Sequence, residues 1–416
     1  MSPAPAASPA AVAAEARPVA PEIAFALRIG QALQERGAPA HRLEDLMAAL
    51  CRRLGLDAQI FSTPTAMFAS FRGPTGGDTH LLRISGSTVD LGRLAELDAI
   101  ATDFLAGRLS PAEGLARLDA ALAAPGYPRW LTALAFGINS AAACRIFGGG
   151  LREMVAALGI GLVTGLLAVF VAGAGRGPKV FEPMAAAVSA ILAAAVSWAL
   201  GPLHVPTATL AGLIALVPGY SLTVALIEVA TRHLASGSAR LVSSLLLFFT
   251  IGFGVAVGGR VAAYLPGGVP SIDPAPLPGW TTFAAILVAC VTFGVIFRAR
   301  PKDYPWICVT GLLGLAGARL GAAFLSPELG SFVGALAVGA ASNLYARLAH
   351  RPAAIPLVPA MMLLVPGRLA LRSLEQMAAN DVVPGLQTAF SMALVAVALA
   401  AGLLFSHELV PPRRAL

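Results

Sequence analysis

The tetrapeptide Leu-Val-Pro-Gly occurs twice in this chain, at 216–219 and at 364–367, each time within a long apolar run. Shifting the sequence by the 148 residues between the copies places every other apolar run of the last two-thirds over a partner. Proline removes a backbone donor and glycine adds freedom, so each copy predicts a broken helix. Two copied halves with one broken helix each are typical of secondary transporters.

Composition agrees with a membrane protein. Charged residues make up 12% of the chain, hydrophobic residues 57%, and the mean hydropathy is +0.77. Soluble domains carry roughly 25% charged residues. The basic excess lies in short loops between apolar runs, where it indicates orientation in the membrane and not nucleic-acid binding. The four cysteines and six histidines lack metal-ligand spacing, so we expect neither a metal nor a cofactor.

The first third of the chain is less apolar. Residues 1–21 are rich in alanine and proline, which predicts a disordered tail. Residues 22–129 predict a cytosolic α+β domain, with Asp90 and Ser110 as N-caps of its last two helices. Apolar periodicity predicts helices over 22–36, 41–54, 91–106 and 111–123, and an antiparallel meander of strands over 58–62, 66–71 and 80–84.

Polar residues cluster at the turns of this meander, among them Ser62, Asp78 and His80. They could form a hydrolase-like site. The alternative is ordinary turn chemistry, since serine and aspartate favour turns for their local hydrogen bonds.

Runs of about 20 apolar residues predict an all-α polytopic membrane domain with ten spans. Five form a first repeat, 130–264, and five a second, 280–407, followed by a short tail, 408–416. Lys and Arg gather in loops on the side of the N-terminal domain, which predicts cytoplasmic termini. Because five is odd, the second repeat runs the opposite way and the repeats are inverted. The spans are 130–149, 154–174, 180–200, 206–228, 241–264, 280–297, 306–325, 329–347, 354–377 and 386–407.

Both prolines of the repeated tetrapeptide fall about halfway along their spans, close to the bilayer centre. Backbone groups left open at that depth must face protein or a wet cavity. We therefore predict that the substrate pathway lies at the two breaks. The residues expected there are Pro218, Gly219, Tyr220, Ser221, Pro366 and Gly367.

Polar side chains near that depth extend the predicted site. Arg368 directly follows the second break. Placing an arginine at the bilayer centre costs at least about 3 kcal/mol of free energy, so such a residue is expected to be functional. Its guanidinium could bind a carboxylate with two hydrogen bonds. Alternatively, the predicted span 354–377 is shorter and Arg368 reaches the outer surface of the membrane. Arg319 in span 7 is a similar candidate, but its side chain can reach the outer interface more easily. Asn139, Ser140 and Asn343 could bind substrate or could join neighbouring helices.

Three carboxylates are candidates for proton coupling. Glu228 and Glu375 follow the prolines by about ten residues, which places them roughly 15 Å from the midplane. Glu182 also lies near an interface. We expect solvated helix ends at these positions. The alternative is proton transfer at the mouth of a cavity, where desolvation raises the pKa of a carboxylate.

A cytosolic α+β domain followed by ten spans in two halves resembles the bacterial threonine/serine exporter family. The resemblance covers nearly all of the chain from Glu22 onward. One departure is 150–153, Gly-Leu-Arg-Glu, where a Gly-Gly turn and an aspartate are expected. The matching segments are 37–44, 61–65, 79–84, 147–149, 216–219 and 236–240.

The resemblance implies a non-enzymatic antiporter of a bacterial inner membrane that exports threonine and serine, coupled to protons. A two-component branch of the family is implied to export succinate, so a small carboxylate remains an alternative substrate. A membrane-anchored hydrolase-like enzyme is the third reading. The expected partners are the small-molecule substrate, the proton, membrane lipid and, in an oligomer, further copies of the chain.

Overall fold

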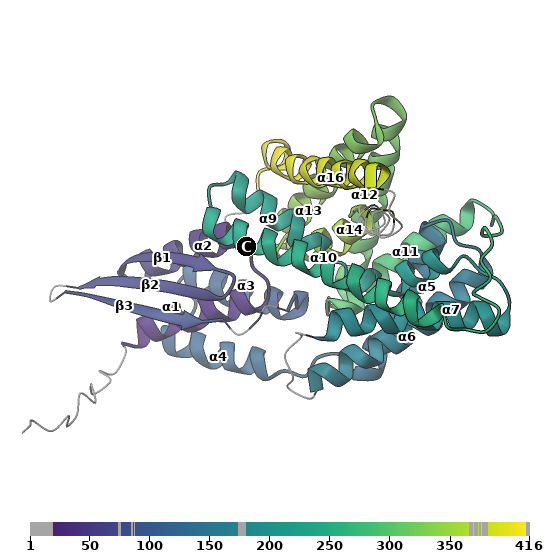
Figure 1. The fold of residues 1–416 in the computed structure, drawn as a ribbon. Coiled ribbons are helices and arrows are strands. Elements are labelled where there is room, and N and C mark those ends of the chain that lie inside the picture. Colours follow the sequence, from purple (N-terminus) through teal and green to yellow (C-terminus); the bar gives the residue numbers. More distant parts are fainter. Residues whose placement is uncertain are drawn as a thin grey trace, which may run out of the picture.

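The computed structural model describes residues 20–412 except 74–75, 85, 87, 174–179, 366–368, 370–372, 374–375 and 377–381. Nearly all of the expected disordered tail lies outside these residues, and so do four predicted site residues: Pro366, Gly367, Arg368 and Glu375. In Figure 1 the N-terminal domain forms one end of the molecule, and the long helices pack together beside it.

The N-terminal domain is a three-stranded sheet backed by helices. Strands β1 (Asp57–Thr63), β2 (Ala66–Gly73) and β3 (Gly76–Arg83) pair antiparallel in that order. Side chains of β2 alternate, because Met67 is fully buried towards the helices and Phe68 is 39% exposed on the other face. The helices are α1 (Pro21–Glu35), α2 (Ala40–Arg53), α3 (Leu91–Leu105) and α4 (Pro111–Ala123).

These four helices confirm the sequence predictions to within a residue or two at each end. The carboxylate of Asp90 accepts a hydrogen bond from the backbone N–H of Arg93, 3.0 Å away, and caps α3. Ser110 and Glu113 form a reciprocal capping box at the start of α4. Strand β3 starts earlier than expected, because Gly76 pairs with Gly73 in a tight hairpin.

The rest of the described chain is mostly helical. Among the described residues, six helices are long and apolar enough to cross a membrane, or seven if a bent pair counts as one span. The expected ten are not all recovered, because α5, α11 and α14 are shorter or less apolar than a full span. The helices are α5 (Arg129–Ile146), α6 (Leu151–Gly173), α7 (Phe181–Leu200), α8 (Val205–Gly212), α9 (Gly219–Ala230), α10 (Leu234–Ala262), α11 (Trp280–Ile296), α12 (Tyr304–Phe324), α13 (Pro327–Ala349), α14 (Ala354–Leu364) and α16 (Val382–Leu409).

The fourth predicted span is interrupted, as expected. Helix α8 ends at Gly212, a single 3₁₀ turn follows, and α9 starts at Gly219, with a 45° bend between the two parts. Val217 leaves the helix in extended conformation, with φ −64° and ψ 122°. Val365, its counterpart in the second tetrapeptide, ends α14 with nearly the same angles, φ −64° and ψ 135°.

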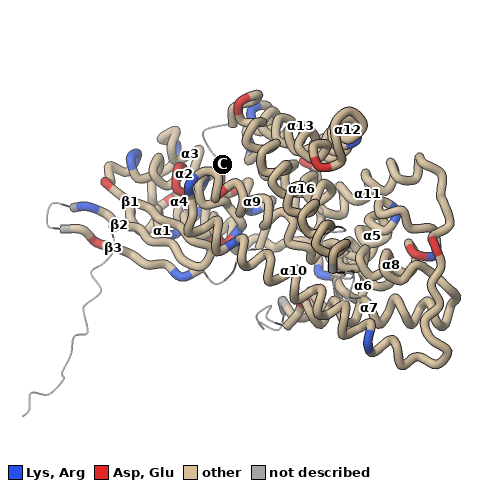
Figure 2. Tube along the Cα trace, turned by 45° about the horizontal axis from the view of Figure 1, so that its top comes forward, with Lys and Arg blue, Asp and Glu red and all other residues tan. Residues whose placement is uncertain are grey.

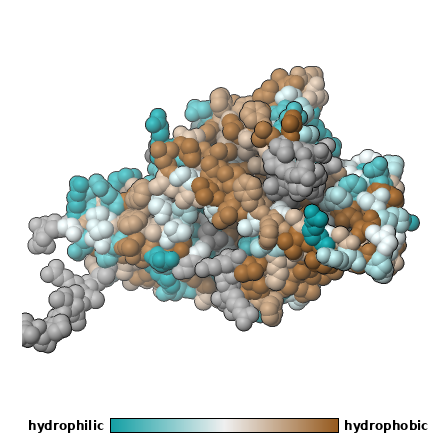
Figure 3. Space-filling view, viewed as in Figure 1, coloured by the Kyte–Doolittle hydropathy of each residue, from teal (hydrophilic) through white to brown (hydrophobic). Residues whose placement is uncertain are grey.

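Charge and hydropathy separate the two parts of the molecule. Figure 2 shows charged residues densely placed in the N-terminal domain and sparsely along the long helices. In Figure 3 the surface over those helices is mostly hydrophobic, whereas the N-terminal domain is largely hydrophilic. This is the distribution expected of a membrane-embedded bundle with a polar domain at one end.

Candidate functional site

The two tetrapeptides meet in space. Gly219 is buried at the first break, and a Cβ added there would overlap the side chain of Val365 at the second. Val217 and Val365 belong to one apolar cluster with Leu222 and Phe248. Glycine is therefore required at 219 for the close approach of the first break to Val365, where α14 ends.

A cavity of about 60 Å³ lies beside this contact, between the N-terminal domain and helices α9, α13, α14 and α16. Two predicted site residues line it, Tyr220 at the start of α9 and Asn343 on α13. Its walls are mostly apolar, with Ile227, Leu357 and Leu403 among the lining side chains. The cavity joins the first break to a surface that the N-terminal domain supplies.

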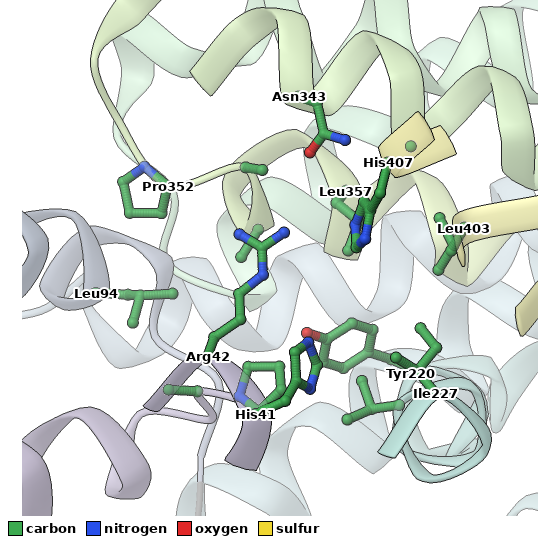
Figure 4. Close-up of a pocket in the computed structure, with 16 residues that line it drawn as sticks. His41, Arg42, Leu94, Tyr220, Ile227, Asn343, Pro352, Leu357, Leu403 and His407 are labelled. Carbon is green, nitrogen blue, oxygen red and sulfur yellow. The ribbon is translucent and has the colours of Figure 1, made fainter. Parts of the chain in front are cut away.

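The first turn of α2 contributes His41 and Arg42 to the cavity, and α16 contributes His407. Figure 4 shows the Arg42 guanidinium extending into the space between these elements and the His41 ring beside Tyr220. Burial, reinforced by Arg42, lowers the pKa of His41 to about 3. His41 is therefore neutral at physiological pH, and the charge of this wall comes from Arg42.

Glu228, near the end of α9, connects the membrane helices to the N-terminal domain. Its carboxylate accepts hydrogen bonds from the backbone N–H of Ala40 at 2.9 Å, from Ser236 Oγ at 3.0 Å and from Arg240 Nε at 3.2 Å. The expectation of a solvated helix end is wrong, because the start of α2 covers Glu228 completely (0% exposed). The positive end of α2 stabilises the carboxylate further. We call these contacts the α9 joint.

A second set of contacts, the α11 joint, attaches the domain to the other half of the bundle. Backbone N–H groups of Leu91 and Gly92 donate to the carbonyls of Phe297 and Arg298, at 2.9 and 3.1 Å. The Arg298 guanidinium lies 3.2 Å from the carboxylate of Asp90. Around this core, Arg300 pairs with Glu96, and the Tyr127 hydroxyl donates to the carbonyl of Ala299 at 2.7 Å.

The remaining predicted site residues lie elsewhere. Asn139 and Ser140 are buried within α5, and Asn139 Oδ1 accepts a hydrogen bond from Thr292 of α11 at 2.9 Å. This contact joins two helices. Arg319 lies on the exposed face of α12, and Glu182 is half-buried in the first turn of α7.

Two further predicted site residues, Ser221 and Asn343, differ in their relation to the cavity. Ser221 is half-buried in α9 and is not among the described residues that line the cavity. Asn343 lines the cavity and also donates its side-chain amide to the carbonyl of Val410, 2.8 Å away. It therefore fastens the end of α16 beside the cavity.

Sequence reasoning missed His41, Arg42 and His407. The signal available for two of them was the segment 37–44, which carries part of the family resemblance but was interpreted only as the end of one helix and the start of the next. Nothing in the sequence placed this turn against α9, because 188 residues separate Ala40 from Glu228.

Comparison with known families agrees with this architecture. The model of the family ThrE, described as "Putative threonine/serine exporter", matches residues 24–262, and "Threonine/Serine exporter, ThrE" matches residues 282–409. The chain belongs to the threonine/serine exporter family. The boundary between the two matches falls between α10 and α11.

Several curated relatives of this family member are fungal proteins named "Pheromone-regulated membrane protein 10". The one from Candida albicans (strain SC5314 / ATCC MYA-2876) is 28% identical over 88% of this chain and 34% of its own length. The Debaryomyces hansenii protein is 27% identical, with coverages of 84% and 36%, and the Eremothecium gossypii protein is 27% identical, with 84% and 48%. The chain thus spans about a third to a half of these relatives. No solved structure matches it.

Proposed function

We propose that this chain is a secondary transporter that exports small hydrophilic amino acids, threonine and serine, from the cytoplasm in exchange for protons. Membership of the exporter family supports transport. The observation that carries the proposal is the contact between the two broken segments at Gly219 and Val365, beside a cavity with polar groups. Interrupted helices that meet in a bundle expose backbone groups for substrate.

The start of α9 is a suitable place for the carboxylate of an amino acid. The first N–H groups of a helix have no partner within it, and they carry the positive end of its dipole. Helix α9 has 12 residues and begins directly at Gly219, next to the cavity-lining Tyr220. Arg368, which we expected to bind the carboxylate from the second break, remains a candidate.

The proposed membrane arrangement follows the sequence. The ten spans form two inverted repeats, 130–264 and 280–407, in a plasma membrane, with the N-terminal domain and the tail in the cytoplasm. Both joints of the domain would then lie at the cytoplasmic ends of α9 and α11. The interrupted pair α8 and α9 would correspond to α14 and the segment after it.

Glu228 is the best placed of the three proposed proton-coupling residues. It holds the N-terminus of α2 and the guanidinium of Arg240 at the end of the broken helix. A proton on this carboxylate would weaken both interactions and loosen the domain at the cavity. Proton binding would thereby favour an opening of the cavity towards the cytoplasm. Glu182 and Glu375 are the other candidates.

Export of succinate or another carboxylate is the second proposal, favoured by the cavity's charge. Arg42 lines it, and no acidic side chain is among the described lining residues. The hydrolase-like alternative loses its strongest residue, because Ser62 is buried and its hydroxyl donates to Glu44 at 3.1 Å. We therefore favour transport over catalysis.

Efflux from loaded cells tests the proposal. Cells that express the full chain and matched cells without it are loaded with radiolabelled threonine, serine or succinate and diluted into substrate-free medium. We expect faster threonine and serine efflux only with the chain, and a further dependence on the proton gradient. Faster efflux of succinate alone would select the second proposal. Equal efflux of all three from both cell populations would reject export.

A further inference from the structure

A pocket of about 250 Å³ borders the α11 joint, separate from the cavity at the first break. It lies where three segments meet: the start of α3, residues 124–127 between α4 and α5, and residues 298–301 between α11 and α12. One arginine of α3 and two of the last segment line it: Arg93, Arg298 and Arg300. We call it the arginine pocket.

Positive charge exceeds negative charge around the arginine pocket. Its described lining residues include the three arginines but only two carboxylates, Asp90 and Glu96. Glu96 pairs with Arg300, whereas one oxygen of Asp90 is shared, 3.2 Å from the Arg298 guanidinium and 3.8 Å from that of Arg93. Each guanidinium carries five N–H donors. The two carboxylates therefore cannot use all the donors that the three arginines bring to the pocket.

A fourth arginine, Arg36 at the end of α1, lies beside this cluster. Burial first, and then Arg93, lowers its pKa, while Asp90 and Glu35 oppose the shift. With Arg36 and Glu35 included, the cations still outnumber the carboxylates by one, four against three. The Nε atom of Arg36 is buried and has no hydrogen-bond partner among the described residues, although buried polar atoms are nearly always paired. The cluster thus offers more donors than the described chain satisfies.

We propose that the arginine pocket binds a phosphate group. Guanidinium groups form paired, charge-assisted hydrogen bonds with phosphate oxygens. A phosphate presents its oxygens in several directions, so it can accept hydrogen bonds from arginines on different elements, whereas a carboxylate presents two oxygens in one plane. The volume of about 250 Å³ is sufficient, since one water molecule needs only roughly 10–15 Å³ of such space.

The phosphate can come from a phospholipid head group or from a soluble compound. The position of the pocket favours the lipid. Tyr127 of the lining closely precedes α5, and Trp130 in the first turn of that helix is 67% exposed, as is typical of aromatic residues at a membrane surface. Basic pockets on the cytoplasmic side of membrane helices bind lipid head groups. The lipid source rests on the proposed membrane arrangement, whereas phosphate binding itself does not depend on export.

A bound phosphate would link the N-terminal domain to the bundle. Arg93 belongs to α3 of the domain, whereas Arg298 and Arg300 belong to the connection between α11 and α12. A phosphate that accepts hydrogen bonds from both sides adds a contact to the α11 joint. A ligand that binds only the folded chain raises its melting temperature. Phosphate binding therefore has a readout that is independent of transport.

Thermal denaturation of the purified full-length chain in an uncharged detergent tests the proposal. Phosphatidic acid, inorganic phosphate and oleate are titrated separately, and the rise in melting temperature gives each apparent affinity. Arg298→Gln removes one guanidinium. Gly126→Leu keeps every arginine but fills the pocket, because a Cβ added at 126 lies 3.8 Å from the Arg298 side chain, at ordinary contact distance. The matched control is Arg108→Gln, since Arg108 is 61% exposed, pairs with Asp103 and is not among the described lining residues.

We expect phosphatidic acid to stabilise the wild type and Arg108→Gln equally, and to bind both pocket variants about 10- to 100-fold more weakly, as for the loss of charged hydrogen bonds. Oleate, which has the charge and the chain but no phosphate, should not stabilise the wild type at the same concentrations. The same pattern with inorganic phosphate alone would identify a soluble source. The proposal is wrong if neither phosphate compound stabilises the wild type, if oleate is as effective as phosphatidic acid, or if Gly126→Leu keeps wild-type affinity.

Discussion

The two joints of the N-terminal domain differ in how their contacts are distributed. At the α9 joint, one fully buried carboxylate, Glu228, receives hydrogen bonds from a backbone N–H, a hydroxyl and a guanidinium. Beside it, the Glu44 carboxylate of α2 lies 3.4 Å from His233 Nε2. At the α11 joint, two backbone hydrogen bonds, two ion pairs and a tyrosine hydroxyl share the contact. The first joint also borders the cavity and the broken helix, whereas the second does not.

A joint that is centred on one buried group can open when that group changes its charge or loses its partner. A joint of several weaker contacts keeps most of its strength when one is lost. The comparison suggests that the α11 joint holds the domain on the bundle while the α9 joint opens and closes the cavity.

The largest effect is expected for Glu228→Gln. The substitution removes the negative charge that Arg240 and the start of α2 share, and breaking a buried pair costs about 3–5 kcal/mol. We expect the chain segment between α4 and α5 to become sensitive to protease, and threonine efflux to fall at least tenfold. Limited proteolysis and efflux measure the two effects.

Glu96→Gln provides the control at the α11 joint. Glu96 pairs with Arg300, and both side chains are about one-third exposed, at 37% and 31%. Such pairs contribute less than about 1 kcal/mol. Protease sensitivity and efflux should stay close to those of the wild type. Equal damage by the two substitutions would contradict the division between the joints.

The sequence predicted the parts of the structure that depend on local periodicity. Helices α3 and α4 and their caps at Asp90 and Ser110 follow from apolar spacing and capping chemistry. The interruption at Pro218 follows from the backbone chemistry of proline and glycine. Each of these features is decided within one or two turns of chain, where sequence neighbours are also spatial neighbours.

A smaller effect is expected for Asp90→Ala. Asp90 caps α3 and pairs with Arg298, so the substitution removes a cap worth about 1 kcal/mol together with one contact of the α11 joint. The melting temperature of the domain should fall, and protease sensitivity should rise only slightly. Ser110→Ala is the matched control, since Ser110 caps α4 away from both joints. Ser110→Ala should lower the melting temperature without changing protease sensitivity. A large rise in protease sensitivity with Asp90→Ala would show that the α11 joint also depends on one residue.

A further effect is a pH dependence at His41, which lies next to the α9 joint. Burial first, and then Arg42, His233, His407 and Arg240, lower the pKa of His41 from 6.5 to about 3. A lowered histidine pKa means that the unfolded state binds the proton more readily below pH 6.5. The contribution of neutral His41 to the free energy of unfolding is therefore fully present above pH 6.5. It is lost as the pH falls towards 3, by at most about 1.4 kcal/mol per pH unit.

His41→Gln should remove this contribution. Melting temperatures of the wild type and the variant, measured at pH 7.5 and pH 5, give the difference. We expect the wild type to lose more stability on acidification than His41→Gln. An equal loss in both proteins would exclude His41 as a buried, neutral member of the joint.

The site itself could be predicted only in part. Tyr220 and Asn343 were found because they lie near the first break or at mid-membrane depth, and both line the cavity. Arg42 and the burial of Glu228 were missed, because each depends on α2 lying against α9. Asn139 was left open between two roles, and its contact with Thr292 joins helices. Such long-range contacts arise from packing, which no local pattern in one sequence encodes.

The central claim is that the two broken segments must meet at Gly219 for transport. Threonine transport by the purified chain in liposomes tests this claim. The variants are Gly219→Ala and Gly219→Ala combined with Val365→Gly. Gly159→Ala is the control, because a Cβ added at 159 meets nothing within 4 Å. Gly219 is helical, and the three atoms nearest to an added Cβ all belong to Val365. We predict at least a tenfold loss for Gly219→Ala, recovery in the double variant and wild-type transport in the control. Wild-type transport by Gly219→Ala would contradict the account.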